Sequence, residues 1–176
     1  RGGDIADADL TPEARRAALQ SLAKIWPDHN TRDLLQRRAV NDDHGYVRGA
    51  ALRALAENWP DQNTRDLLQG RAVNDTHREP RSRALRALAE QWGDQDAREL
   101  IQQRAVNDDD VYTRAAALRA LAETWPDQKT RELLQRRAVQ DPEEEARGAA
   151  FDALGAMHSE FGRILPTGDL DEIGPH

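Results

Sequence analysis

The sequence predicts an all-α fold, an α-solenoid of stacked antiparallel helix pairs with a period of 33 residues. The first observation is that the four tryptophans, Trp26, Trp59, Trp92 and Trp125, stand 33 residues apart. The second is a frame that recurs around each of them without insertion, from WPDHNTRDLLQRRAVND in the first copy to WPDQKTRELLQRRAVQD in the last. The third is the helical spacing of apolar residues within each copy. Tandem units of this length are typical of solenoids, because one unit buries its apolar face only by stacking on the next.

The first helix of each unit begins directly after an aspartate that can cap it. These aspartates are Asp28, Asp61, Asp94 and Asp127. An apolar stripe with i, i+3, i+4 spacing follows, and in the first copy it consists of Thr31, Leu34, Leu35, Ala39 and Val40. This spacing predicts a helix of about 11 residues.

The second helix of each unit ends at a Trp-Pro pair in most copies, because a residue before proline is pushed out of the helical region. Such helices are expected to begin at about Thr11, His44, His77, Asp110 and Glu143. The apolar side of the one that ends at Trp59 consists of Val47, Ala51, Leu52 and Leu55. We expect the tryptophans at these helix ends to fill the gaps between layers as core residues.

An aspartate is followed six residues later by an arginine in every unit. The five pairs are Asp9/Arg15, Asp42/Arg48, Asp75/Arg81, Asp108/Arg114 and Asp141/Arg147. Together with the period and the A-x-x-A-L pattern of the second helix, these pairs resemble the HEAT repeat over residues 9–158. The resemblance implies that the aspartate between the two helices and the arginine early in the second helix form a ladder between adjacent repeats.

Two narrower resemblances carry functional implications. The Trp-Pro-Asp turn is similar to that of bacterial HEAT arrays attached to NACHT or STAND signalling NTPases, which implies a sensor or regulatory arm. The repeats are also similar to the HEAT-like repeats of bilin lyases, which would imply an enzyme.

The repeat pattern divides the chain into three regions. Residues 1–10 form a lead-in, residues 11–158 form the repeat array, and residues 159–176 form a tail that packs on the last repeat. We expect the apolar residues of the tail to fold back over the last helix; these are Ile164, Leu165, Leu170 and Ile173. Because the pattern opens on a second-type helix, we also expect this chain to be a piece of a longer protein.

The composition disfavours several classes of partner and chemistry. The net charge of -7 opposes nonspecific attraction to nucleic acid and to anionic membranes. No cysteine is present, so disulfides, thiolate metal sites and cysteine nucleophiles are excluded. No apolar run approaches the roughly 18 residues of a membrane span, and no signal-peptide pattern opens the chain. We therefore expect a soluble, cytoplasmic protein.

Catalytic and metal-binding patterns are missing from the sequence. It contains no G-x-x-x-x-G-K-[ST], no HExxH and no G-x-S-x-G motif. Of the histidines, only His44 and His77 share a repeat position, about 10 Å apart if the helices stack normally. That spacing favours surface histidines over a zinc site, whose ligands converge on one ion. We expect no cofactor, no metal and no enzymatic activity.

One row of side chains on the second helices is the main candidate for binding. Arg53, Arg86 and Arg119 recur at the period, and each has a glutamate four residues later. The row is either a solvated salt-bridge face or a strip that binds an acidic peptide or phosphates. The HEAT resemblance implies that it lies on the concave surface.

Residues that vary between copies add candidates, because stacking does not dictate them. They are Tyr46, Tyr112 and Arg83, of types favoured at interfaces. The sequence thus predicts a non-enzymatic module that binds a protein partner or another part of its own polypeptide. A nucleic-acid-binding array using the arginine row and a bilin-lyase-like enzyme are the alternatives.

Overall fold

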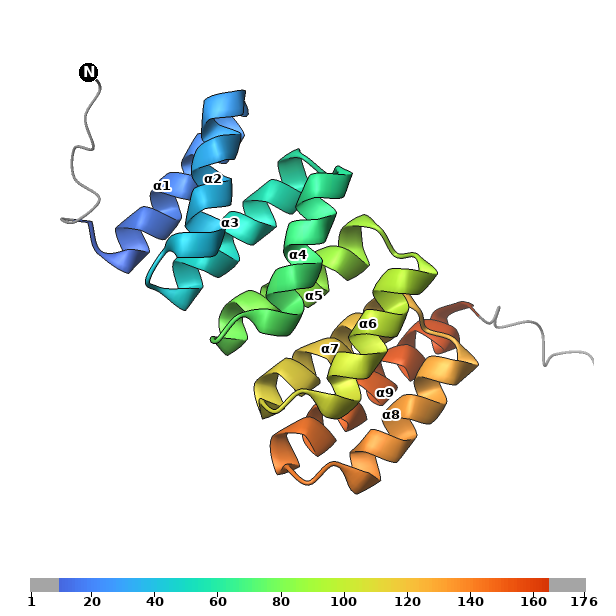
Figure 1. Cartoon of the computed structure of the whole chain (residues 1–176). Coiled ribbons are helices and arrows are strands. Elements are labelled where there is room, and N and C mark those ends of the chain that lie inside the picture. Colours follow the sequence, from blue (N-terminus) through green and yellow to red (C-terminus); the bar gives the residue numbers. More distant parts are fainter. Residues whose placement is uncertain (1–9, 165–176) are drawn as a thin grey trace, which may run out of the picture.

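The computed structural model describes residues 10–164, in which nine α-helices and no strand are found. The helices are α1 (Pro12–Ile25), α2 (His29–Asn41), α3 (Gly45–Asn58), α4 (Gln62–Asn74), α5 (Arg78–Gln91), α6 (Gln95–Asn107), α7 (Val111–Thr124), α8 (Gln128–Gln140) and α9 (Glu144–Ile164). They follow one another along an elongated array, with α1 at one end and α9 at the other (Figure 1). The predicted all-α solenoid of helix pairs is confirmed.

The helices form two layers. The first layer consists of α2, α4, α6 and α8, and the second layer consists of α1, α3, α5, α7 and α9. Consecutive second-layer helices pack directly against each other, and each first-layer helix packs mainly on the second-layer helix that follows it. Within residues 10–164, no two first-layer helices approach as closely, so the array bends toward the second layer.

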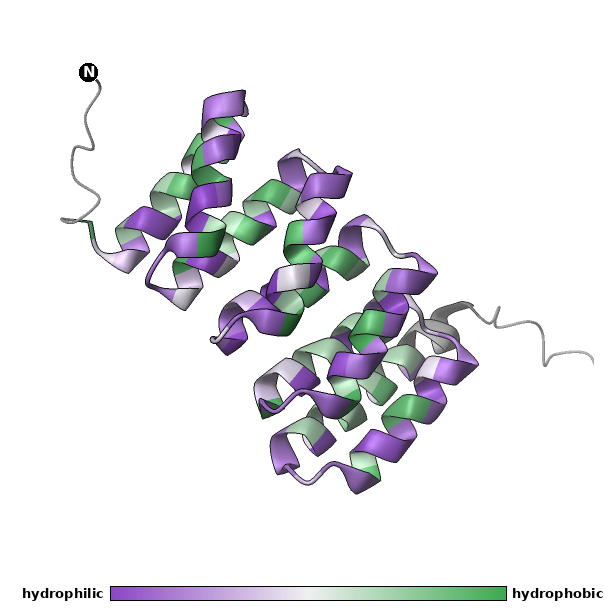
Figure 2. Cartoon of the chain, viewed as in Figure 1, coloured by the Kyte–Doolittle hydropathy of each residue, from purple (hydrophilic) through white to green (hydrophobic). Residues whose placement is uncertain are grey.

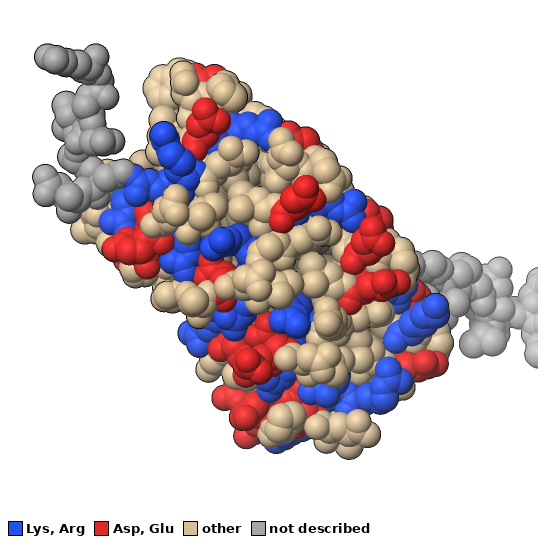
Figure 3. All heavy atoms as spheres, in the orientation of Figure 1, with Lys and Arg blue, Asp and Glu red and all other residues tan. Residues whose placement is uncertain are grey.

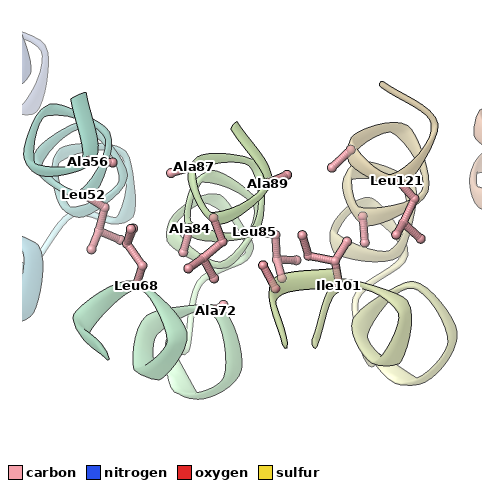
Figure 4. Packing of buried hydrophobic residues seen from close by; sticks show 14 of the residues in the cluster. Leu52, Ala56, Leu68, Ala72, Ala84, Leu85, Ala87, Ala89, Ile101 and Leu121 are labelled. Carbon is pink, nitrogen blue, oxygen red and sulfur yellow. The ribbon is translucent and has the colours of Figure 1, made fainter. Parts of the chain in front are cut away.

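The core lies between the two layers. Leu52 of α3 and Leu85 of α5 are fully buried there, together with Leu68 and Ile101 from the first layer (Figure 4). Hydrophobic residues face the interior of the array and hydrophilic residues cover the outside of the helices (Figure 2). Each repeat thus completes the core of its neighbour, as the sequence predicts.

The predicted N-caps of the first-layer helices are confirmed. The side chains of Asp28, Asp61, Asp94 and Asp127 each accept a hydrogen bond of 2.8–3.0 Å from the backbone N–H three residues later. These bonds satisfy amide groups that would otherwise be unpaired at the helix start.

Arginine–aspartate pairs join the turns of successive repeats. Arg48 donates from Nε and Nη2 to Asp75 of the next repeat, at 3.0 and 2.7 Å, and from Nη1 to the backbone oxygen of Asp42 at 2.8 Å. We call this set the turn ladder; its pairs are Arg15–Asp42, Arg48–Asp75, Arg81–Asp108 and Arg114–Asp141. The ladder that the HEAT resemblance implies is therefore present.

A second ladder connects the N-caps and was not predicted. Its pairs are Arg32–Asp61, Arg65–Asp94 and Arg98–Asp127, and we call it the N-cap ladder. Each arginine of one first-layer helix reaches the capping aspartate of the next. The same carboxylate thus caps its own helix and binds the preceding repeat.

The tryptophans are less buried than predicted. Trp59, Trp92 and Trp125 are only partly buried at the edge of the core, and Trp26 is 60% exposed. Each tryptophan lies directly after the last residue of its helix. The leucine and alanine side chains of the last helical turn already fill the core there. Trp125 instead donates from Nε1 to the backbone oxygen of Gly93, in the turn of the preceding repeat, at 3.1 Å. The described residues contain no turn before α1 with which Trp26 could make the equivalent contact.

Helix α9 continues past the predicted end of the array at residue 158 and reaches Ile164. In the other repeats a proline or a glycine follows the tryptophan and stops the helix, whereas Ser159 follows His158 here. The predicted tail boundary at residue 159 therefore falls inside a helix. The predicted lid contacts of Leu165, Leu170 and Ile173 lie outside the described residues, as does the side chain of Ile164.

Helix α5 ends differently from the other second-layer helices of the array because Gly93 stands where the corresponding turns after α1, α3 and α7 have proline. Gly93 has a φ of 54° and donates its N–H to the backbone oxygen of Leu88 at 3.4 Å. A left-handed residue after a helix end is strained for any side chain and natural for glycine. The turn is thus closed by a glycine cap in place of Trp-Pro.

Candidate functional site

Four hollows lie side by side along the second layer, one between each pair of consecutive helices. Their volumes are about 170 Å³ between α1 and α3, 170 Å³ between α3 and α5, 260 Å³ between α5 and α7, and 220 Å³ between α7 and α9. We call the four together the second-layer groove. Its floor carries one alanine at the same repeat position in each hollow, namely Ala54, Ala87, Ala120 and Ala153.

The groove exists because small residues line the contacts between second-layer helices. Alanine side chains let the helix backbones approach, and they leave the space above them to longer side chains from the neighbouring turns. The positions that project there recur at i, i+3 and i+7, so they share one face of the helix. In α3 these positions hold Ala50, Arg53 and Glu57, all of which line the groove.

The predicted row of Arg53, Arg86 and Arg119 lines the groove. Two of its members form salt bridges with glutamates of the same helix, as expected for a solvated salt-bridge face. Arg53 donates from Nε to Glu57, and Arg86 donates from Nε to Glu90, both at 2.6 Å. The Glu90 carboxylate raises the pKa of the Arg86 guanidinium. Within the described residues, neither arginine makes a hydrogen bond from its Nη atoms. The glutamates therefore orient each guanidinium and leave its two terminal nitrogens available.

Arg119 differs from the other two members of the row. It has a glutamate four residues later, but in the described part of the chain it makes no ion pair within 4.0 Å. It lines both the α5–α7 hollow and the α7–α9 hollow. An exposed, unengaged guanidinium thus stands at the boundary between two hollows.

Arg83 adds a fourth guanidinium to the groove. It occurs where the neighbouring copies have alanine, lines two hollows, and donates from Nε to Glu79 at 2.9 Å. Its stem lies against Gly49 of α3, where an added Cβ would stand 3.1 Å from Arg83 Cγ. The glycine at position 49 therefore leaves room for the Arg83 side chain.

The two predicted tyrosines do not line the four hollows. Tyr46 is 52% exposed and stacks on His44, with ring centroids 5.6 Å apart. Tyr112 is 49% exposed, and the guanidinium carbon of Arg78 lies 4.3 Å from its ring centroid. Both stand one turn before the groove residues of their helices. The structure thus brings the four arginines together and leaves the tyrosines at the rim.

The α7–α9 hollow has a different character from the other three. Most of its lining is apolar, from Ala122, Ala153, Ala156 and Met157. Asp152 stands where the preceding repeats have the row arginine, and Ala156 stands where they have the glutamate. These substitutions are visible in the sequence, but only the helix spacing shows that they create an apolar end of the groove.

Charge is distributed unevenly along the groove. In each of the first three hollows, the lining cations outnumber the lining carboxylates by one. In the α7–α9 hollow, carboxylates outnumber cations by one. The outer face of the first layer, by contrast, shows basic and acidic residues interspersed (Figure 3).

Residues 10–164 contain no group of three or more histidines and carboxylates that could hold a metal ion. His77 lies with Nδ1 2.9 Å from Arg48 Nη2, and His44 stacks on Tyr46, so the two do not converge. Among the described helices, none has the length and apolar character needed to cross a bilayer.

Comparison with known proteins gives one match. The family profile described as HEAT repeats matches residues 4–89 and 64–155, which together cover most of the chain. No curated protein and no solved structure matches the chain.

Proposed function

Because the chain belongs to the HEAT-repeat family, we propose that it is a non-enzymatic interaction module that binds a protein partner in the second-layer groove. Repeats of this kind commonly mediate contacts between proteins, and their stacked layers present extended surfaces rather than single pockets. The observation that carries the proposal is the continuous line of hollows, in which the arginines expose nitrogens that make no hydrogen bond within the described residues.

The arrangement suits recognition better than turnover. Each charged residue of the groove is exposed or half-buried, and most have copies at the same position of other repeats. A catalytic site needs a nucleophile or base whose surroundings differ from its neighbours. Exposed guanidinium groups, in contrast, provide planar donors for carboxylates and act as anchors of interfaces.

A matched pair of variants tests this proposal. Arg86→Glu with Arg119→Glu reverses two charges in the groove, and Arg37→Glu with Arg136→Glu reverses two charges on the first layer. Proteins that bind the tagged chain are identified by quantitative mass spectrometry, and the best candidate is purified and titrated against each variant. We expect a partner that the first-layer variant retains and the groove variant binds at least about tenfold more weakly. Equal binding by both variants would contradict the proposal.

A narrower form of the proposal makes the chain a sensor arm of a larger signalling protein. It is supported by the similarity of the Trp-Pro-Asp turns to those of arrays attached to NACHT or STAND NTPases. In that form the groove partner is another domain of the same polypeptide or a regulator of it. A P-loop module encoded in the same reading frame would support this form, and its absence from the complete reading frame would contradict it.

A further inference from the structure

We infer that the second-layer groove binds an extended peptide that carries a carboxylate at every third residue and, three residues beyond one end of that row, an apolar side chain. The inference rests on the proposed function and specifies its partner. It combines three observations: one available arginine on each of α3, α5 and α7, a regular helix spacing, and an apolar hollow at the α9 end.

The helix spacing sets the period of the ligand. Helices that pack through alanine lie about 8–10 Å apart, so the row arginines recur at about that interval. A peptide in the polyproline II conformation has three residues per turn and rises about 3.1 Å per residue. Every third side chain of such a peptide therefore points the same way, about 9 Å from the last. A β-strand would place alternate members of that series on opposite sides.

The hydrogen-bonding state of the arginines selects carboxylates. In Arg53 and Arg86, Nε is held by a glutamate of the same helix, and the Nη atoms have no partner within the described residues. A carboxylate can accept from the two Nη atoms together, which is a strong and oriented contact. Arg119, without an ion pair among the described residues, can take the third carboxylate.

The charge balance argues against a polyanion such as single-stranded nucleic acid. The linings of the first three hollows together hold five cations and four carboxylates, so the excess of positive charge is small. Glu57, Glu90 and Glu123 also stand beside the arginines. A phosphate backbone would bring charges against these carboxylates, whereas a peptide places neutral residues there.

The α7–α9 hollow provides the anchor at the end of the peptide. Its apolar lining excludes a fourth charged group, and Asp152 and Glu123 repel a carboxylate there. An aliphatic side chain loses water on entering this hollow of about 220 Å³ and gains contact with Met157. The groove is thus expected to bind a peptide with a row of acidic residues and one apolar residue at the α9 end of that row. The peptide chain can run in either direction along the groove.

The experiment uses the full chain and fluorescein-labelled synthetic peptides. The test peptide is Asp-Pro-Pro-Asp-Pro-Pro-Asp-Pro-Pro-Leu, made in both directions, and the control has the same composition with the three aspartates adjacent. Fluorescence anisotropy at low salt measures Kd. We expect the better direction of the test peptide to bind about tenfold more tightly than the control. Equal affinity for test and control, or no binding of either direction, would overturn the inference.

Protein variants locate the contacts. Arg119→Glu should weaken binding of the test peptide about tenfold, while Arg136→Glu on the first layer leaves it unchanged. Replacing the terminal leucine by alanine should weaken binding to the native chain, and this difference should vanish in Ala156→Glu, which puts a charge into the apolar hollow. Circular dichroism confirms that each variant is folded. An Arg119→Glu chain that binds as the native chain does would overturn the inference.

Further outcomes separate this inference from the proposed function. If a protein partner depends on the groove arginines but neither peptide binds, the peptide inference fails and the proposed function stands. If single-stranded DNA with the same number of charges displaces the test peptide more efficiently than unlabelled peptide does, the assigned partner class is wrong.

Discussion

Arg98 of α6 places its Nη2 2.7 Å from Oδ1 of Asp127, the residue that caps α8 in the next repeat. The carboxylate also accepts from the backbone N–H of Thr130 at 3.0 Å. One aspartate therefore both starts a helix and ties that helix to the preceding repeat.

This contact predicts a dependence of stability on pH. The Arg98 hydrogen bond, with a further contribution from the hydrogen bonds of Thr130, lowers the pKa of Asp127 from 3.8 to about 2. Because this pKa is lower in the folded state than in the unfolded state, the ionised carboxylate stabilises the fold at pH values above the unfolded pKa. That stabilisation is lost as the pH falls from about 4 to about 2. Asp127→Asn keeps a capping side chain but cannot carry the charge. We expect the native chain to be the more stable at pH 6 by thermal unfolding, and the two Tm values to converge near pH 2. A difference independent of pH would contradict this account.

The turn ladder should contribute through the cost of breaking it. Arg48 and Asp75 are almost completely buried, so removing Arg48 leaves the Asp75 carboxylate in the interior with the longer contact to Arg71, at 3.5 Å, as its only ion pair among the described residues. We expect Arg48→Met to lower the free energy of unfolding by about 3 kcal/mol. The double variant with Asp75→Asn should cost less than the sum of the single variants, by about 1–3 kcal/mol. Urea denaturation measures the cycle, and additive effects would show that the pair is not coupled.

The half-exposed Arg32–Asp61 pair of the N-cap ladder serves as the control for that cycle. Solvent screens this contact, and its coupling energy should stay below about 1 kcal/mol. A coupling as large as that of the turn ladder would mean that burial does not set the difference.

The tryptophans should differ in their contribution to stability. Trp125 packs on the edge of the core and donates a hydrogen bond to Gly93, so Trp125→Ala should lower the free energy of unfolding by about 2 kcal/mol. Trp26 is 60% exposed, and Trp26→Ala should cost about 0.5 kcal/mol. Equal losses in chemical denaturation would show that both indoles are equally buried.

Two glycines should respond in opposite directions to the same substitution. Gly93 has a φ of 54°, and Gly93→Ala should destabilise the chain by about 1 kcal/mol through backbone strain. Gly70 lies inside α4, where an added Cβ would meet no other atom within 4 Å, and Gly70→Ala should stabilise by about 0.5–1 kcal/mol through helix propensity. Thermal unfolding of the two variants checks the signs, and a stabilising Gly93→Ala would contradict the assigned turn.

The sequence was sufficient for the repeat, the helix pairs and the N-caps, because each depends on local spacing within one period. The turn ladder, which joins adjacent repeats, was implied by the HEAT resemblance. The N-cap ladder was missed because the role of Asp127 as a helix cap already explained the recurrence of that aspartate, and no resemblance assigned it an arginine partner such as Arg98. Trp26 was assigned to the core by analogy between copies, although an indole at the end of the described array lacks the neighbour that its copies have.

The candidate site was predicted in part. Periodicity placed Arg53, Arg86 and Arg119 on one face, and the variation between copies pointed to Arg83. Periodicity could not show that Arg119 has no ion pair among the described residues while Arg53 is held by Glu57, since that depends on side-chain conformation. It also could not show that Tyr112 faces Arg78 at the rim, because this contact depends on how adjacent helices are placed.

The most direct test of the account is an NMR titration of the chain, labelled at its alanine methyl groups, with the partner or the acidic test peptide. The groove methyls belong to Ala54, Ala87, Ala120 and Ala153, and the reference methyls of the first layer belong to Ala39, Ala72, Ala105 and Ala138. We predict chemical-shift changes in the groove set with the first-layer set unmoved. Changes confined to the first-layer set, or spread equally over both sets, would contradict binding in the groove.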